Sequence, residues 1–144
     1  MKKEKLINPK IFSMTNNTKK RKRATAIVET DNGILIVSHS RHGKIEYMLP
    51  GGGIKRGEHP ICAAVRELYE ETGLHTVEAK YLFDLVTEHN EHKVFLIKPY
   101  GKLRKRHETT HIRFYNDSTK DKYKLAWHVI PIIEKYRRLR GNII

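Results

Sequence analysis

Residues 52–74 read GGIKRGEHPICAAVRELYEETGL, a glycine-rich start that leads into a helical pattern. Pro60 suits the first turn of a helix and Gly73 suits the position just after its end, so the pattern predicts a helix over residues 60–72. Cys62 lies off the acidic side of this helix and is expected to be a packing residue. The side chains at i, i+3 and i+4 spacing predict the face toward the core: Ile61, Ala64, Val65, Leu68 and Thr72.

A second face of the predicted helix is acidic. Glu67, Glu70 and Glu71 lie together there, because positions three and four apart are neighbours on a helix. Such a face is commonly a solvated surface, but clustered carboxylates repel one another, and one or two Mg²⁺ ions, which prefer oxygen ligands, would offset that repulsion. Arg66, beside Glu67 and four residues before Glu70, can orient a carboxylate through charge-assisted hydrogen bonds. The acidic face is therefore a candidate metal site.

The residues ahead of the helix extend this candidate site. Glu58 can reach back to Arg66 or to the free N–H groups of the first helical turn. The glycines at 51–53 let the backbone come close to a metal ion, where a carbonyl could be a further hard ligand. Residues 50–53 are expected to form a loop, because proline and glycine interrupt the strand predicted before them.

The complete spacing of the segment resembles the Nudix box, Gly-x5-Glu-x7-Arg-Glu-U-x-Glu-Glu-x-Gly-U, in which U is an aliphatic residue. At average residue usage, nine matched positions would arise by chance at on the order of 10⁻⁹ per start point. The sequence is therefore identified as similar to the Nudix (MutT-like) hydrolase family, over roughly residues 23–140. The matched positions are Gly52, Glu58, Arg66, Glu67, Leu68, Glu70, Glu71, Gly73 and Leu74.

The resemblance implies the fold of that family. We expect an α/β (α+β) architecture, an α/β/α sandwich with a mixed β-sheet between helices, which the order of strands, helix, strands and closing helix also favours. Residues 23–144 are expected to form this Nudix hydrolase domain. Residues 1–22 are expected to be a basic, flexible N-terminal tail.

The resemblance also implies an activity, the metal-dependent hydrolysis of pyrophosphate bonds in compounds of the form nucleoside diphosphate linked to X. By matching position, Glu67, Glu70 and Glu71 would bind Mg²⁺ or Mn²⁺, with the Gly52 carbonyl as a further ligand. Arg66 would hold Glu67, and Glu58 would brace the loop. A metal-activated water would attack phosphorus, and Glu67, Glu71 or a carboxylate outside the box would accept its proton. No residue is assigned to substrate binding.

Members of the family often draw one more carboxylate from a loop beyond the box. Glu108, just before the strand predicted at 111–115, is our candidate, and Glu88 and Glu91 are the alternatives. His89 and His92 bracket a turn, which is either a second metal site or a plain surface turn.

The rest of the chain predicts the frame around this site. Asn32-Gly33 between apolar runs predicts a β-hairpin. The segment 122–140 has helical spacing interrupted by Pro131, so we expect a kink or a helix that begins near it. Trp127 and Tyr136 fit the core face of that helix better than a platform for a base. Further strands are predicted at 24–29, 34–37, 45–49, 79–87, 93–97 and 111–115.

The charge of the chain is strongly positive. Of the net charge of +13, residues 1–23 contribute +8, with nine Lys/Arg and one Glu. The run at 19–23 is either a solvated arm or a contact with nucleic acid or a targeting factor. The clusters at 98–106 and 120–140 could meet a long polyphosphate or an RNA 5′ end, or could equally be solvated surface. The expected partner is a nucleotide-type small molecule, with RNA through the basic tail as a further partner.

Two other functions remain open beside hydrolysis of a nucleotide substrate. One is removal of pyrophosphate from an RNA 5′ end, which the basic tail and clusters motivate. The other is a non-catalytic Nudix module that binds a nucleotide or RNA, against which the complete acidic set argues. No apolar run approaches the roughly 20 residues needed to cross a bilayer, and the N-terminus lacks a secretory signal. We therefore expect a cytoplasmic (intracellular) protein without a membrane partner.

Overall fold

The strands form two β-sheets, which lie between two helices. In this computed structural model, which describes residues 20–39 and 43–143, one sheet has the order β4-β1-β6-β5 and the other the order β2-β3-β7. The elements are β1 (Arg21–Ile27), β2 (Glu29–Thr30), β3 (Gly33–Ser38), β4 (Gly51–Gly53), α1 (Pro60–Thr72), β5 (His75–Val86), β6 (Asn90–Tyr100), β7 (His111–Tyr115) and α2 (Val129–Ile143).

The larger sheet is mixed. Strand β1 runs parallel to β6 but antiparallel to β4, and β5 and β6 form a long antiparallel pair. The predicted α/β (α+β) fold with a mixed sheet is therefore confirmed, although the strands divide between two sheets rather than one. Strand β1 begins at Arg21, two residues before the expected start of the domain at Arg23. The tail prediction for residues 1–19 lies outside the described residues.

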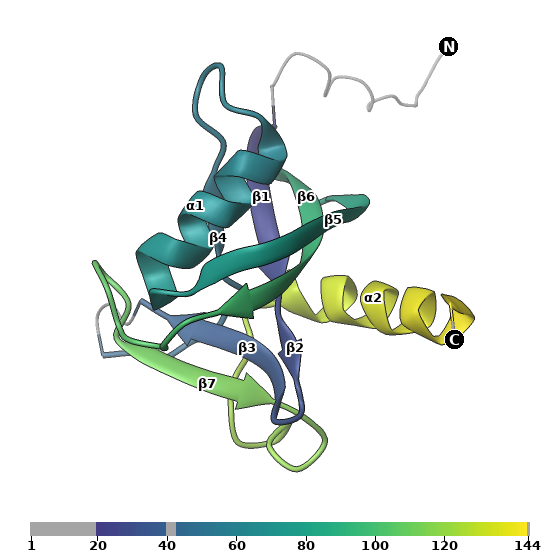
Figure 1. Cartoon of the computed structure of the whole chain (residues 1–144). Coiled ribbons are helices and arrows are strands. Elements are labelled where there is room, and N and C mark those ends of the chain that lie inside the picture. The colour runs from purple at the N-terminus through teal and green to yellow at the C-terminus, as the bar shows by residue number, and fades with distance from the viewer. Residues whose placement is uncertain (1–19, 40–42, 144) are drawn as a thin grey trace.

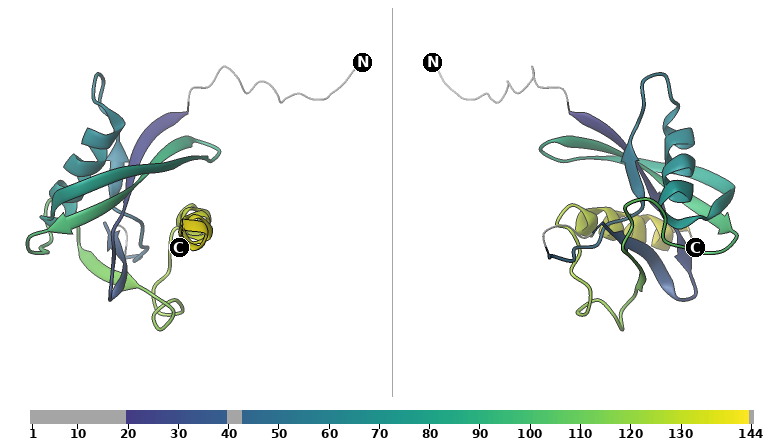
Figure 2. Two further views of the ribbon diagram at one scale, coloured as in Figure 1. Left: turned by 45° about the vertical axis from the view of Figure 1, so that its right-hand side comes forward. Right: turned by 90° about the vertical axis from the view of Figure 1, so that its left-hand side faces the viewer.

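The two helices cover opposite faces of the sheets (Figures 1 and 2). Successive side chains of a strand point to opposite faces of the sheet, so the same strand can pack against both helices. In β1, Ala24 and Ala26 join the apolar cluster under α1, whereas Ile27 joins the cluster under α2. Because Ala63 and Ala64 of α1 are also small and fully buried, the helix can approach β1 closely.

The buried face of α1 differs from the predicted stripe. Ala64, Leu68 and Thr72 are buried as expected, but Ala63 is buried too, whereas Ile61 is 39% exposed. The glutamate Glu71 is itself buried, with 7% of its surface exposed. The core face is therefore rotated toward the acidic residues, because the small alanines pack against the sheet. The packing role predicted for Cys62 is wrong, since Cys62 is exposed.

The glycines before α1 form a strand rather than the predicted loop. Gly51–Gly53 is β4, paired with β1 so that Thr25 lies opposite Gly51. A Cβ at Gly51 would lie 2.4 Å from the Ala24 carbonyl oxygen, so the close approach of the two chains requires glycine there. The strand predicted at 45–49 is reduced to isolated bridges, with Val37 opposite Met48.

The predicted chain reversals and the closing helix are found. Gly33 has φ of +120° in the β2–β3 hairpin, and Gly73 ends α1 with φ of +77°. Helix α2 begins at Val129, so Pro131 sits in its first turn, and Tyr136 is buried as predicted. Trp127 precedes the helix and is 66% exposed, so its predicted place in the core is wrong. None of the helices in the described part of the chain is long and apolar enough to cross a membrane.

Candidate active site

Arg66 gathers three carboxylates at one end of the site. Its Nε and Nη2 donate to the two carboxylate oxygens of Glu58 at 2.7 and 2.9 Å. Its Nη1 donates to Glu67 at 3.0 Å and to Glu70 at 3.2 Å, and Nη2 also reaches the Gly53 carbonyl oxygen at 3.2 Å. The paired hydrogen bonds from Arg66 are the main cause that lowers the pKa of Glu58 to about 2. One guanidinium thus orients three anions and ties them to β4.

Gly52 lies directly against the carboxylate of Glu67. A Cβ at position 52 would stand 2.3 Å from Glu67 Oε2 and 2.4 Å from its Cδ, so no other residue fits without moving that carboxylate. The backbone of β4 and the Glu67 side chain are therefore in close contact, and a carbonyl ligand at Gly52 stays a prediction.

Glu71 is held apart from this group, on the buried side of α1. Its Oε1 accepts a hydrogen bond from the Gly51 N–H at 3.0 Å, and its Oε2 lies 3.4 Å from His39 Nε2. Burial raises the pKa of Glu71, while His39 and the Gly51 N–H oppose that rise. The hydrogen bond to Glu71 in turn raises the pKa of His39.

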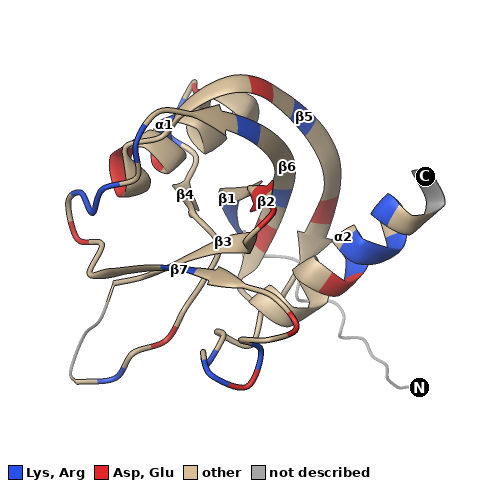
Figure 3. Ribbon diagram, turned by 60° about the horizontal axis from the view of Figure 1, so that its bottom comes forward, with Lys and Arg blue, Asp and Glu red and all other residues tan. Residues whose placement is uncertain are grey.

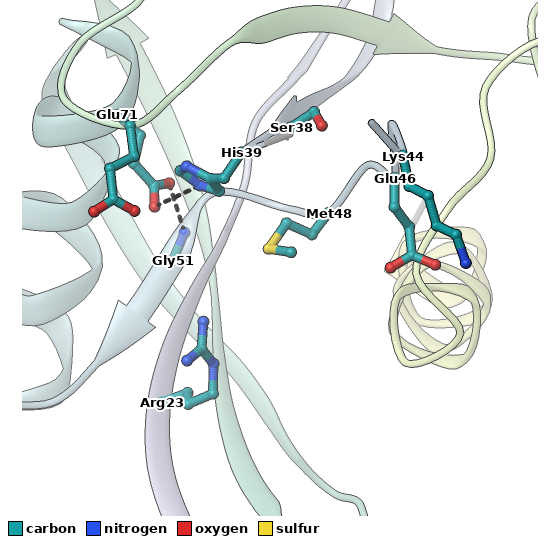
Figure 4. A pocket seen from close by; sticks show the side chains of 9 residues that line it. Arg23, Ser38, His39, Lys44, Glu46, Met48, Gly51 and Glu71 are labelled. Atoms are coloured by element: carbon teal, nitrogen blue, oxygen red, sulfur yellow. Dashed lines mark hydrogen bonds and ion pairs between the residues drawn. The ribbon is translucent and has the colours of Figure 1, made fainter. Parts of the chain in front are cut away.

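A pocket of about 560 Å³ opens over Glu71 (Figure 4). Glu108, the carboxylate proposed from outside the box, lines the same pocket. The alternatives do not line it: Glu88 is highly exposed, and Glu91 pairs with Lys93 at 3.2 Å. The lining residues come from β1, β3, β4, α1 and the segments before β4 and β7: Arg23, Ser38, His39, Lys44, Glu46, Met48, Gly51, Glu71 and Glu108.

Several pocket residues were not predicted from the sequence. His39 lies just after the end of β3, and Arg23 lies in β1 opposite Gly53, so each reaches the pocket only through strand pairing. Burial lowers the pKa of Arg23, and the charges of Glu67 and Glu71 oppose this shift. Arg23 and Lys44 bring positive charge to a pocket that also holds carboxylates, an arrangement suited to binding phosphate oxygens.

The donor atoms suit a hard cation, but they are divided between two sets. No three His, Cys, Asp or Glu side chains among residues 20–39 and 43–143 are grouped closely enough to hold a metal ion. Glu67 and Glu70 turn to Arg66, and Glu71 turns to Gly51 and His39. Carboxylate oxygens are the ligands that Mg²⁺ and Mn²⁺ take, so these residues fit such an ion in chemistry, while their present partners compete with it.

The two histidines near the β5–β6 turn, His89 and His92, lie in different environments. His89 is exposed beside Glu88, whereas His92 is buried and its ring stacks on that of His128 at 5.2 Å. Burial is the main cause that lowers the pKa of His92 to about 4, so this imidazole is neutral near pH 7. In the described part of the chain, these histidines belong to no group that could hold a metal.

The three glycines of β4 predict three different outcomes on substitution. Gly52→Ala should displace the flexible Glu67 carboxylate and lower activity about 10²-fold with little loss of stability. Gly51→Ala should unfold at lower temperature, because its Cβ meets the Ala24 backbone. Gly53→Ala is the control, since nothing lies within 4 Å of its Cβ. Kinetics and thermal unfolding of all three would test this order, and an active Gly52→Ala enzyme would contradict the role of Glu67.

Comparisons with known proteins agree on the family. The family model described as the NUDIX domain matches residues 19–126. A nudix hydrolase family member from Chromobacterium violaceum is 35% identical, with a TM-score of 0.76 over 85% of this chain and 79% of that one.

Two curated relatives match shorter stretches. The RNA pyrophosphohydrolase of Agrobacterium fabrum is 61% identical over 22% of this chain and 18% of its own length. Diphosphoinositol polyphosphate phosphohydrolase 2 of Mus musculus is 33% identical over 53% of this chain and 44% of its own length. These matches thus span less than half of each relative. Since the family model covers well over half of the 144 residues, and the fold and the box agree with it, the chain belongs to the Nudix family.

Proposed function

We propose that this protein is a metal-dependent pyrophosphohydrolase, which cleaves a diphosphate bond in a nucleoside diphosphate-linked or nucleoside triphosphate substrate by attack of water on phosphorus. One observation carries the proposal: a single pocket unites Glu71 of the box with Glu108 of a distant loop and with the cations Arg23 and Lys44. Carboxylates that can hold a metal ion thus face cations that can hold phosphate.

In this proposal, Glu67, Glu70, Glu71, Glu108 and the Gly52 carbonyl hold Mg²⁺ or Mn²⁺. When bound, the metal neutralises the diphosphate oxygens and lowers the pKa of the attacking water. Arg66 and Glu58 are positioning residues, because they hold Glu67 and Glu70 through the hydrogen bonds described above.

The remaining pocket residues supply binding and proton transfer. Arg23 and Lys44 bind and orient phosphate oxygens. Glu71 is the favoured proton acceptor, because its side chain lines the pocket, whereas Glu67 is held by Arg66. His39, 3.4 Å from Glu71, keeps that carboxylate aimed into the pocket. Glu67 is the alternative base.

The names of the relatives support the reaction class. An RNA pyrophosphohydrolase and a diphosphoinositol polyphosphate phosphohydrolase both act on phosphorus anhydrides, but on different substrates. Because these two relatives differ in substrate, their names support the class of bond that is cleaved and do not select the molecule that carries it.

Metal removal tests the proposal directly. Nucleoside triphosphates, ADP-ribose, dinucleoside polyphosphates, nucleotide sugars and 5′-triphosphorylated RNA would be incubated with the protein and Mg²⁺ or Mn²⁺. We expect at least one to be hydrolysed, activity to vanish with a chelator, and excess Mg²⁺ to restore it. Binding of a ligand without hydrolysis of any substrate would instead identify a non-catalytic module.

A further inference from the structure

The largest surplus of positive charge in the folded part lies in residues 101–125. Residues 101–125 hold eight Lys/Arg and three Asp/Glu, a surplus of five. With the surplus of eight in residues 1–23, this accounts for the whole net charge of +13, so the remaining chain is neutral on balance. Helix α2 has a smaller surplus, with four Lys/Arg and one Glu, and it offsets the acidic excess of residues 24–100. A segment with the largest surplus of a domain indicates an anionic partner.

The structure places this segment around β7, the edge strand of the smaller sheet. A groove of about 520 Å³ lies between β7 and the loop before it, and another of about 490 Å³ lies beside β7 and the segment 122–124. Neither groove is lined by an acidic side chain. Figure 3 shows the basic residues before, on and after β7. Their exposed cations, here called the β7 surface, are Arg104, Lys105, Arg113, Lys122 and Lys124.

These cations lack the carboxylate partners that other cations of the protein have, although Lys122 Nζ lies over the Tyr123 ring, 6.0 Å from its centre. Arg66, Lys93 and Arg140 form ion pairs, whereas no described carboxylate lies within 4 Å of any cation of the β7 surface. Arg113 donates only to the neighbouring Ile112 carbonyl. When such a basic cluster binds a polyanion, its cations replace the counterions condensed along the phosphates, and the release of those counterions favours binding.

The β7 surface adjoins the candidate active site. His111, at the start of β7, pairs with Ser38, which lines the catalytic pocket. On the other side, Lys44 and Glu46 line that pocket, while Ile45 and Tyr47 line the second groove. The same short segments thus form a wall of the pocket and a wall of a basic groove.

We propose that the β7 surface binds the sugar-phosphate backbone of a single-stranded RNA whose 5′ polyphosphate lies in the catalytic pocket. This proposal rests on the proposed function and names the substrate class. A chain is favoured over a single nucleotide, because the cations extend along both sides of a strand, outside the pocket. Tyr123, half-buried with its ring 5.1 Å from that of Tyr47, adds an aromatic surface on which a base can stack.

The test uses Lys122→Gln/Lys124→Gln in the full chain. Its matched control is Lys80→Gln/Arg138→Gln, two exposed cations that line neither groove. With a chelator present, fluorescence anisotropy would measure binding of a short 5′-triphosphorylated RNA. At about 0.1 M salt we expect about tenfold weaker binding by the groove variant, and a salt slope shallower by about 1.4, at about 0.7 per lost phosphate contact. The control should match the wild type.

A hydrolysis measurement separates this proposal from the proposed function. With Mg²⁺, the groove variant should lose about tenfold in kcat/KM on triphosphorylated RNA and less than about twofold on a free nucleoside triphosphate. Unchanged RNA binding by the groove variant would overturn the RNA proposal, even where nucleotides are hydrolysed. An equal loss on a diphosphoinositol polyphosphate would overturn it in favour of a small polyanion. Loss of RNA binding in a protein that hydrolyses nothing would overturn the proposed function and support the RNA surface.

Discussion

Glu71→Gln is expected to lower kcat by at least about 10³-fold on whichever substrate the wild type hydrolyses. The substitution keeps the size of the side chain, and its amide oxygen can still accept the Gly51 N–H hydrogen bond. It removes the negative charge that would hold a metal ion and the basicity that would accept a proton. The loss should therefore appear in kcat, with KM changed little.

The fold should tolerate this change. Burial already raises the pKa of Glu71, which means that the protein interior disfavours its charge, so a neutral amide costs little stability. Thermal unfolding should shift by no more than a few degrees, in either direction. Glu88→Gln is the matched control, because that glutamate is highly exposed and lies outside the pocket. Equal activity of Glu71→Gln and wild type would remove Glu71 from the site.

The box allowed the helix and the contacts of Arg66 to be predicted, because both depend on residues close together in the sequence. Pro60 and Gly73 bound α1 where the sequence placed its ends, and Arg66 reaches Glu67, Glu70 and Glu58, as their spacing along one helix and its preceding loop suggests. Neighbours on a helix surface follow from its 3.6-residue period, so no knowledge of the rest of the fold was needed.

The errors arose where distant strands decide the outcome. The burial of Glu71 and the exposure of Ile61 depend on how closely α1 can approach the alanines of β1, which periodicity does not specify. The strand β4 forms because its partner β1 supplies a ladder, although its glycines alone favour a loop. His39 and Arg23 reach the pocket through the same pairings, so no local pattern could mark them.

Glu108 and Trp127 also show that the positions of single residues depend on the fold around them: Glu108 lies in the pocket, whereas Trp127 lies outside the core. Glu108 was selected only for its place before a predicted strand, and its position in the pocket depends on the pairing of β7 with β3. Trp127 was assigned to the core from helical spacing, but the helix begins after it, so that spacing does not apply. A sequence period is informative only inside the element that it describes.

Arg66→Ala should produce the second large effect, and it should do so differently with and without metal. Without metal, the variant leaves Glu58, Glu67 and Glu70 close together with no cation between them. The Arg66 side chain is 21% exposed, so the cost should lie between that of exposed and buried pairs, about 2 kcal/mol in the free energy of unfolding. Denaturant unfolding in a chelator would measure it.

A bound metal ion should then restore part of the stability that the Arg66 guanidinium provided. In the wild type, Arg66 competes with a metal ion for Glu67 and Glu70, whereas in Arg66→Ala this competition is removed. Mg²⁺ or Mn²⁺ should therefore raise the melting temperature of the variant more than that of the wild type. Equal increases in the two proteins would show that these carboxylates do not bind the metal.

Activity should not recover together with stability. A metal ion can neutralise Glu67, but it cannot replace the planar guanidinium of Arg66. That group contacts Glu58 and the Gly53 carbonyl and so holds the Glu67 carboxylate against Gly52. We therefore expect the metal-saturated variant to remain about 10²-fold slower than the wild type. Arg66→Lys separates charge from shape: it should regain much of the metal-free stability but little of the rate, because an ammonium group cannot hold two carboxylates in one plane.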